Sequence, residues 1–121
     1  MIDFGEQIFG DSNPRFDATN VLVISDRHTK WIDCFPQGHK TTADVIQSLS
    51  QFVSPGEKVF HLYCDNGAEL LAAAKHMNWR CGTATTGMPE TNGLAERNVR
   101  IAKDGGTACF VQSGFSKRWW V

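Results

Sequence analysis

The segment Cys-Asp-Asn-Gly-Ala-Glu-Leu at residues 64–70 determines how the rest of the chain is interpreted. The run of residues 58–64 is apolar and suits a strand, and the Asn-Gly pair that follows is typical of a tight turn. This order predicts that Asp65 lies at the end of a strand, just before a helix. An aspartate before Asn-Gly is also ordinary turn chemistry, so Asp65 alone does not identify a function.

A second segment, Pro-Glu-Thr-Asn-Gly-Leu-Ala-Glu-Arg at residues 89–97, carries another acid at the start of an element. A loop rich in Pro, Gly and Asn precedes the helix that is expected from Leu94. Glu96, Arg100 and Lys103 recur at helical spacing, so one face of this helix carries an acid followed by two bases. A glutamate in a first turn also interacts favourably with the helix dipole, which is its structural interpretation.

The third candidate acid is Asp11, which follows the weakly strand-like residues 2–10. Its assignment depends on its position at the end of that first segment. Asp17, Asp26 and Asp33 are alternatives for the same role.

Hydrophobic periodicity predicts an α/β fold. The expected elements, in order, are strands at residues 2–10, 21–25 and 29–35, a helix from Thr41-Thr42 to Pro55-Gly56, a strand at 58–64, a helix at 68–78, a strand at 79–85 and a helix from Leu94. The Gly105-Gly106 pair is expected to kink or end the last helix, since each glycine costs about 1 kcal/mol of helix propensity. Three successive strands suit an antiparallel meander, and strands entered through a helix suit parallel pairing. The prediction is a mixed five-stranded sheet flanked by helices.

With 121 residues the chain has room for one domain, residues 1–121. Its four cysteines, Cys34, Cys64, Cys81 and Cys109, include no Cys-x-x-Cys pair and are expected to be buried free thiols in a reducing compartment. The sequence shows no signal peptide and no apolar run of the roughly 18 residues that a membrane span needs. We therefore expect an intracellular protein without a membrane partner.

Charge is distributed unevenly, although the formal net charge is −1. Residues 1–79 carry six Lys/Arg and ten Asp/Glu, which gives −4, and residues 80–121 carry six and three, which gives +3. The acidic part can hold cations and the basic part can contact phosphates. Carboxylates from three separate elements suit hard divalent cations such as Mg²⁺ or Mn²⁺. Two such ions can activate an attacking oxygen and stabilise a leaving oxygen in phosphoryl transfer.

Together, the two acidic segments resemble those of retroviral-type integrases. Residues 64–69 look like the family's S/T/C-D-N-G-x-E segment, and residues 89–97 look like its P-x-x-N-G-x-x-E-R segment. The stretch Ser113–Trp120 is similar to the L-P-x-x-F/W-W stretch that follows the glutamate in integrases of copia-type LTR retrotransposons. With the matching order of elements, the resemblance covers essentially the whole chain and implies a ribonuclease H-like fold.

The resemblance implies an integrase catalytic core, a metal-dependent polynucleotidyl transferase and endonuclease. Such a core processes the 3′ ends of retrotransposon cDNA and joins them to target DNA. The implied catalytic acids are Asp11, Asp65 and Glu96, which would bind two Mg²⁺ or Mn²⁺ ions, and Asn66 would shape the site. The residues implied to contact DNA are Asn92, Arg100 and Lys103.

The resemblance also implies a C-terminally truncated core that lacks the zinc-binding and C-terminal domains of complete integrases. The full-length protein is expected to be a homo-oligomer, located in the nucleus or in a cytoplasmic particle of a retroelement. One alternative is a degenerate or domesticated core that binds nucleic acid without catalysis. Others are a ribonuclease H-type hydrolase, against which the Pro-x-Thr-Asn-Gly loop argues, and an interaction module with a different fold.

Overall fold

Three strands come first along the chain, and helices and strands then alternate, as the sequence predicts. This computed structural model describes residues 2–6, 18, 20–83 and 93–115, with residues 2–6 described through their backbone. The elements are β1 (Ile2–Glu6), β2 (Asn20–Ser25), β3 (Ile32–Gln37), α1 (Thr42–Phe52), β4 (Leu62–Cys64), α2 (Ala68–His76), β5 (Cys81–Thr83) and α3 (Gly93–Ser113). Their order is the predicted one.

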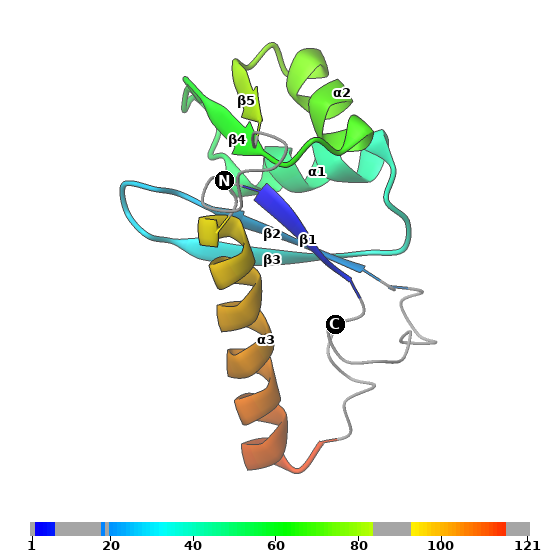
Figure 1. The fold of residues 1–121 in the computed structure, drawn as a ribbon, viewed down its shortest axis with the longest axis vertical. Helices are drawn as coiled ribbons and strands as arrows, with labels where there is room; N and C mark the ends of the chain where they lie inside the picture. Colours follow the sequence, from blue (N-terminus) through cyan, green and yellow to red (C-terminus); the bar gives the residue numbers. More distant parts are fainter. Residues whose placement is uncertain (1, 7–17, 19, 84–92, 116–121) are drawn as a thin grey trace.

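The strands join in the order β3-β2-β1-β4-β5 (Figure 1). β1, β2 and β3 form an antiparallel meander, and β4 and β5 form a parallel pair. The two parts meet in parallel where Ile2 of β1 lies beside Cys64 of β4. The predicted mixed sheet is therefore built from a meander and a parallel pair with a narrow connection between them.

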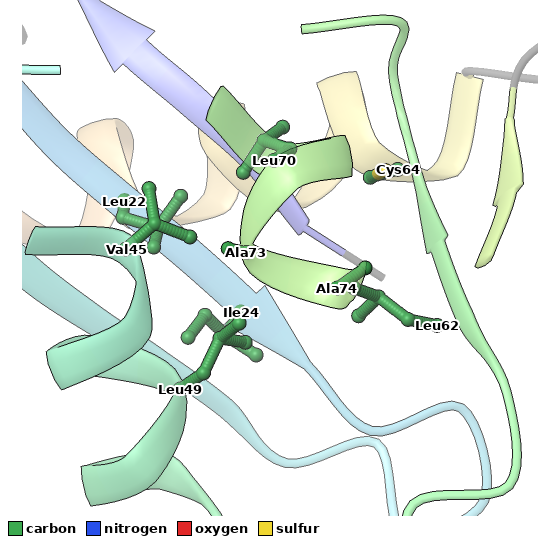
Figure 2. Packing of buried hydrophobic residues seen from close by; sticks show 9 residues of the cluster. All are labelled: Leu22, Ile24, Val45, Leu49, Leu62, Cys64, Leu70, Ala73 and Ala74. Atoms are coloured by element: carbon green, nitrogen blue, oxygen red, sulfur yellow. The ribbon is translucent and has the colours of Figure 1, made fainter. Parts of the chain in front are cut away.

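The two faces of the sheet are covered by different helices. On one face, a buried core joins β2 and β4 to α1 and α2 (Figure 2); its members are Leu22, Ile24, Val45, Leu49, Leu62, Cys64, Leu70, Ala73 and Ala74. Because successive strand residues point to opposite faces, Val21 and Val23 of β2 lie on the other face, against Val99 and Ala102 of α3. α1 and α2 thus form one layer, the sheet a second, and α3 a third.

α1 begins where the sequence predicts. Thr41 is its N-cap, and the Thr41 hydroxyl accepts a hydrogen bond from Asp44 N at 3.2 Å and donates one to the Asp44 carboxylate at 2.8 Å. The cap satisfies one of the N–H groups that a first turn leaves unpaired. Val45 and Leu49, on the predicted apolar face, are buried.

Three strands begin later than predicted, and one of them, β5, starts at Cys81 rather than at residue 79. β3 starts at Ile32 rather than at residue 29, because the turn before it closes between Asp26 N and Trp31 O at 2.9 Å. β4 starts at Leu62 rather than at residue 58, at the level where Leu62 N donates to Arg80 O and the ladder with β5 begins. Apolar character suits a residue to a strand, but the partner strand sets where the strand begins.

α3 is one continuous helix, so the predicted break at Gly105-Gly106 is wrong. Two glycines cost about 1 kcal/mol each relative to alanine, but extending a helix that has already formed adds a hydrogen bond for each residue. The helix ends before Gly114, whose φ is 71° and whose N–H donates to Phe110 O at 3.1 Å. Gly114 thus caps the end of α3. The second half of α3 extends beyond the sheet (Figure 1).

The four cysteines are free thiols, as predicted, but they are not all buried. Cys64 is buried and Cys81 is half-buried beside it, whereas Cys34 and Cys109 are exposed. Cys34 lies on the edge strand β3, and Cys109 lies in the half of α3 that extends beyond the sheet. Among the described residues, none of the helices combines the length and apolar character needed to span a bilayer.

Candidate functional site

Asp65 directly follows β4 and precedes α2. Its Oδ1 accepts a hydrogen bond from Gly67 N, two residues ahead, and this bond helps to turn the chain from the strand into the helix. The side chain is half-buried, and a carboxylate can accept several hydrogen bonds or metal contacts in addition to this one. Asp65 therefore shapes the turn and retains the capacity to bind a ligand.

Glu96 lies in the first turn of α3 and is exposed. Ala95 and Asn98, which flank it on the inward side of the helix, are buried. Asn98 Nδ2 donates to Ser25 Oγ at the end of β2, at 2.7 Å. This buried hydrogen bond fixes the start of α3 on the sheet, and with it the turn that carries Glu96.

The strand register places Asp65 and the start of α3 at the same end of the sheet. Ser25, which anchors α3, directly follows Ile24, and Ile24 pairs with Ile2 of β1. Ile2 pairs in turn with Cys64, the residue before Asp65. α3 packs on both β1 and β2, in agreement with this order. Two acids that are distant in the sequence are thereby brought to one end of the fold.

The same register identifies an acid that the sequence interpretation missed. β1 and β4 run parallel with Ile2 beside Cys64, so the residues that follow, Asp3 and Asp65, are at the same level on neighbouring strands. Asp3 is also part of the antiparallel ladder between β1 and β2. The order Ile2-Asp3-Phe4 is the ordinary alternation of a strand with one solvated face, so the residues around Asp3 offer no separate signal for it.

The predicted first acid, Asp11, lies outside the described residues, as do its alternative Asp17 and the predicted DNA contact Asn92. Across the side chains that the structure describes, no three His, Cys, Asp or Glu residues come together closely enough to hold a metal ion. The side chain of Asp3 is not among those described.

Two further alternatives to Asp11 are placed by the structure. Asp26 accepts hydrogen bonds from His28 N and Thr29 N, each at 3.1 Å, and from the Thr29 hydroxyl at 2.6 Å. The Thr29 hydroxyl, followed by the two backbone donors, lowers the pKa of Asp26 from 3.8 to about 2. Asp33 lies on β3, which β2 and β1 separate from β4. Asp26 thus organises a turn, and Asp33 is distant from Asp65 in the sheet.

The predicted DNA contacts on α3 are exposed. Arg100 and Lys103 lie on the face that also carries Glu96, while the opposite side of the helix packs on β2. Two positive charges therefore follow the acid along the helix, at positions where they can contact phosphates. Asn66, the predicted site-shaping residue, is exposed in the turn after Asp65.

A pair of thiols lies behind this end of the sheet, on the core side. The Sγ atoms of Cys64 and Cys81 are 3.3 Å apart. Burial, followed by the hydrogen bond with Cys81, raises the pKa of the Cys64 thiol to about 12. Cys64 is therefore a neutral thiol near neutral pH.

The donor set suits a hard divalent cation. Asp65 and Glu96 offer carboxylate oxygens that solvent can reach, whereas the nearby Cys64 thiol is neutral and faces the core. Mg²⁺ and Mn²⁺ prefer oxygen ligands, and Zn²⁺ prefers thiolate and imidazole. The backbone of Asp3 lies at a neighbouring position of the sheet.

No protein-family model and no curated protein matches the sequence, but solved structures do. The chain is similar to the catalytic core domain of BIV integrase, with a TM-score of 0.64 and 18% identity over 98% of this chain and 74% of that one. It is also similar to a chain of the simian T-cell lymphotropic virus intasome in complex with the PP2A regulatory subunit B56 gamma. That match has a TM-score of 0.75 and 19% identity over 95% of this chain and 41% of that one.

These comparisons define the class of the fold. The chain has the ribonuclease H-like fold of retroviral integrase catalytic cores, with a mixed sheet between two helices on one face and a third on the other. It spans less than half the length of the intasome chain.

Proposed function

We propose that this chain is a catalytic core of the retroviral integrase type, which transfers polynucleotide strands on DNA. The observation that carries the proposal is the register that places Asp3, Asp65 and the start of α3 at one end of the sheet. The likeness of the fold to integrase cores and the basic residues that follow Glu96 on α3 support the same activity.

In this function, Asp65 and Glu96 hold two Mg²⁺ or Mn²⁺ ions together with a third acid. When bound, the ions activate the attacking oxygen and neutralise charge on the leaving oxygen. The protein supplies orientation: Gly67 N holds the Asp65 carboxylate, and the Asn98–Ser25 hydrogen bond fixes the turn of Glu96.

The polar residues around these acids position the DNA. Arg100 and Lys103 bind backbone phosphates, and Asn66 shapes the turn beside Asp65. Asn92, which precedes Glu96 by four residues, is proposed as a further DNA contact. We propose two steps at one site. In the first, water attacks a phosphodiester near the 3′ end of the cDNA, and the P–O bond that breaks releases the terminal nucleotides and leaves a new 3′ hydroxyl. In the second, this hydroxyl attacks a phosphodiester of the target DNA and displaces the 3′ oxygen of the target strand.

The finer identity is that of a copia-type LTR retrotransposon integrase. It is supported by the stretch Ser113–Trp120, which follows the glutamate helix as in that group. One of the similar structures is an intasome, and we propose that the full-length protein likewise acts as a homo-oligomer on DNA. Its site of action would be the nucleus or a cytoplasmic particle of the element.

Two residues are candidates for the first acid. Asp11 is proposed from its position after the first segment of the sequence, and Asp3 from its place beside Asp65 in the sheet. The register favours Asp3, because neighbouring strands place its Cα within one strand spacing, about 4.8 Å, of the strand that leads to Asp65. Asp3→Asn and Asp11→Asn should therefore differ, with activity lost in the variant of the true ligand and retained in the other.

The function is tested by Mn²⁺-dependent strand transfer, or by its reversal on a branched DNA substrate. Asp65→Asn and Glu96→Gln should each lower the rate by about 10²- to 10³-fold, because each removes a charged group that stabilises the transition state. Asp104→Asn, an exposed acid on the same helix, is the matched control and should leave the rate unchanged. Wild-type rates in either site variant would remove that residue from the site.

The alternative is a non-catalytic DNA-binding core. It holds if the wild-type chain binds DNA without joining it, and if neither Glu96→Gln nor Mg²⁺ changes that binding.

A further inference from the structure

The face of β4 opposite to the core carries a row of polar side chains that leads to Asp65. Leu62 and Cys64 of β4 are buried against α1 and α2, so Tyr63 between them points to the opposite face. The imidazole of His61 lies on the face of Tyr63 too, because it reaches the Cβ position of Gly82, the residue that pairs with Tyr63, and Asp65 directly follows the strand. His61 is exposed, and Tyr63 is half-buried.

Gly82 of β5 makes room for these side chains. It pairs with Tyr63 in the parallel ladder, and a Cβ on Gly82 would lie 2.7 Å from His61 Nε2 and 3.4 Å from Tyr63 Cδ2. The imidazole of His61 therefore occupies the space that a side chain at position 82 would fill, close to the ring of Tyr63. A residue larger than glycine would displace the imidazole.

Arg80 adds a positive charge to this face. Its neighbours Trp79 and Cys81 pack against the core, so Arg80 points to the opposite face, and it is exposed. Arg80 O accepts a hydrogen bond from Leu62 N at 2.7 Å, which holds this residue beside β4. Arg80, His61 and Tyr63 thus form a strip with a cation at one end and an aromatic ring close to Asp65.

We propose that this strip holds the unpaired nucleotides of a DNA end beside the phosphate that reacts at Asp65. A base stacks on Tyr63, while Arg80 and His61 contact the sugar-phosphate backbone. A positive groove with an aromatic ring is the usual means of binding single strands without sequence preference. The inference rests on the proposed function, since it names the substrate feature that is recognised beside that site.

The dimensions of the strip agree with this role. Alternate residues of a strand are about 6.6 Å apart, so Tyr63 lies about 6.6 Å along the chain from Asp65. A base on Tyr63 therefore belongs to a nucleotide close to the reacting phosphate. The positive charge of Arg80 is complementary to the negative charge of the DNA backbone.

The test compares two DNA ligands of equal length, a duplex with a short unpaired end and a blunt duplex, by fluorescence anisotropy without divalent metal. Tyr63→Leu should weaken binding of the unpaired end about tenfold, which is at the lower end of the effect of one stacked base, and should leave blunt DNA unaffected. Tyr63→Phe keeps the ring and should bind both ligands as the wild type does. Unchanged binding by Tyr63→Leu, or an equal loss for both ligands, would overturn the proposal.

Two surface variants provide an independent test should Tyr63→Leu fail to fold. Gly82→Ala should weaken binding of the unpaired end by displacing the end of the His61 side chain, while Gly105→Ala, with open space around its Cβ position, is the matched control. Arg80→Ala should lower the salt dependence for the unpaired end by about one unit of slope. Wild-type behaviour of both Gly82→Ala and Arg80→Ala would contradict the proposal.

Failure of this inference is distinguishable from failure of the proposed function. Asp65→Asn should abolish joining and still bind the unpaired end as the wild type does. If Asp65→Asn retains joining while Tyr63→Leu loses affinity for the unpaired end, the proposed function is wrong and the strip remains a binding site. If joining depends on Asp65 but Tyr63→Leu behaves as the wild type, the strip is wrong and the function stands.

Discussion

The two faces of the sheet differ in how they are held and in what they carry. On the α1 and α2 face, side chains such as Leu22, Val45 and Leu49 are at most 1% exposed. On the α3 face, one helix covers β1 and β2 through a few apolar contacts and the buried Asn98–Ser25 hydrogen bond. The described residues that we assign to DNA binding or catalysis lie on the α3 face of the sheet or at the end of the sheet where α3 begins. Burial is therefore concentrated on one face, and the residues proposed for activity lie on the other.

The largest expected effect separates the two faces by stability. Leu49→Ala should lower the free energy of unfolding by about 2–5 kcal/mol, because Leu49 is fully buried and its loss leaves a cavity. Val99→Ala on α3 should cost at most about 1.5 kcal/mol, since it removes two methyl groups from a half-buried side chain at about 0.8 kcal/mol each. Urea denaturation followed by tryptophan fluorescence measures both. Equal losses of unfolding free energy in the two variants would show that both faces contribute equally to stability.

The next effect concerns the polar anchor of α3. Asn98→Ala removes the buried hydrogen bond to Ser25 and should cost about 1–3 kcal/mol of stability. Because Asn98 fixes the turn that carries Glu96, strand transfer should fall while DNA affinity changes little. Ser25→Ala is the matched variant, and the double variant should lose less than the sum of the two single losses. Additive losses would show that Asn98 and Ser25 act separately.

Local patterns predicted the order of the elements and pointed to two candidate acids at element boundaries. Asp65 and Glu96 were predicted because each sits at an element boundary within a recognisable segment. Asp3 was not a candidate in the sequence because it is proposed from a pairing between β1 and β4 that joins residues about sixty positions apart, and alternation within β1 does not reveal a partner strand. The order of the elements could be predicted as well, because turn residues and hydrophobic periodicity are local properties of the sequence.

The break predicted in α3 was wrong for a related reason. Helix propensity is a local preference of about 1 kcal/mol for each glycine, and the structure of the whole helix outweighs it. The exposed thiols Cys34 and Cys109 were also mispredicted, because burial depends on which strand lies at the edge and which part of a helix has a partner. Both errors concern properties that tertiary packing decides.

A smaller effect is expected in the half of α3 that extends beyond the sheet. Gly105→Ala should stabilise the protein by about 0.5–1 kcal/mol, because its Cβ meets open space and alanine favours a helix. Gly114→Ala is the contrasting variant and should destabilise, since its φ of 71° is unfavourable for a side chain. Thermal unfolding measures both shifts. If Gly105→Ala is destabilising, this half of the helix packs against another surface at position 105.

The smallest expected effect belongs to Asp26, whose carboxylate organises the turn between β2 and β3. Its pKa in the folded protein, about 2, is below the ordinary value of 3.8, so the folded state favours the ionised carboxylate. The contribution of Asp26 to stability is therefore complete above about pH 4 and is lost as the pH falls towards 2. The difference in melting temperature between the wild type and Asp26→Asn should be present at pH 5 and should shrink as the pH falls through this window.

Thr29→Ala removes the hydroxyl that contributes most to the lowered pKa of Asp26, and the pH dependence of the Asp26→Asn effect should be weaker in that background. A pH-independent difference would assign the effect to turn geometry rather than to the charge of Asp26, whereas a loss of strand transfer in Asp26→Asn would return this residue to the list of candidate acids.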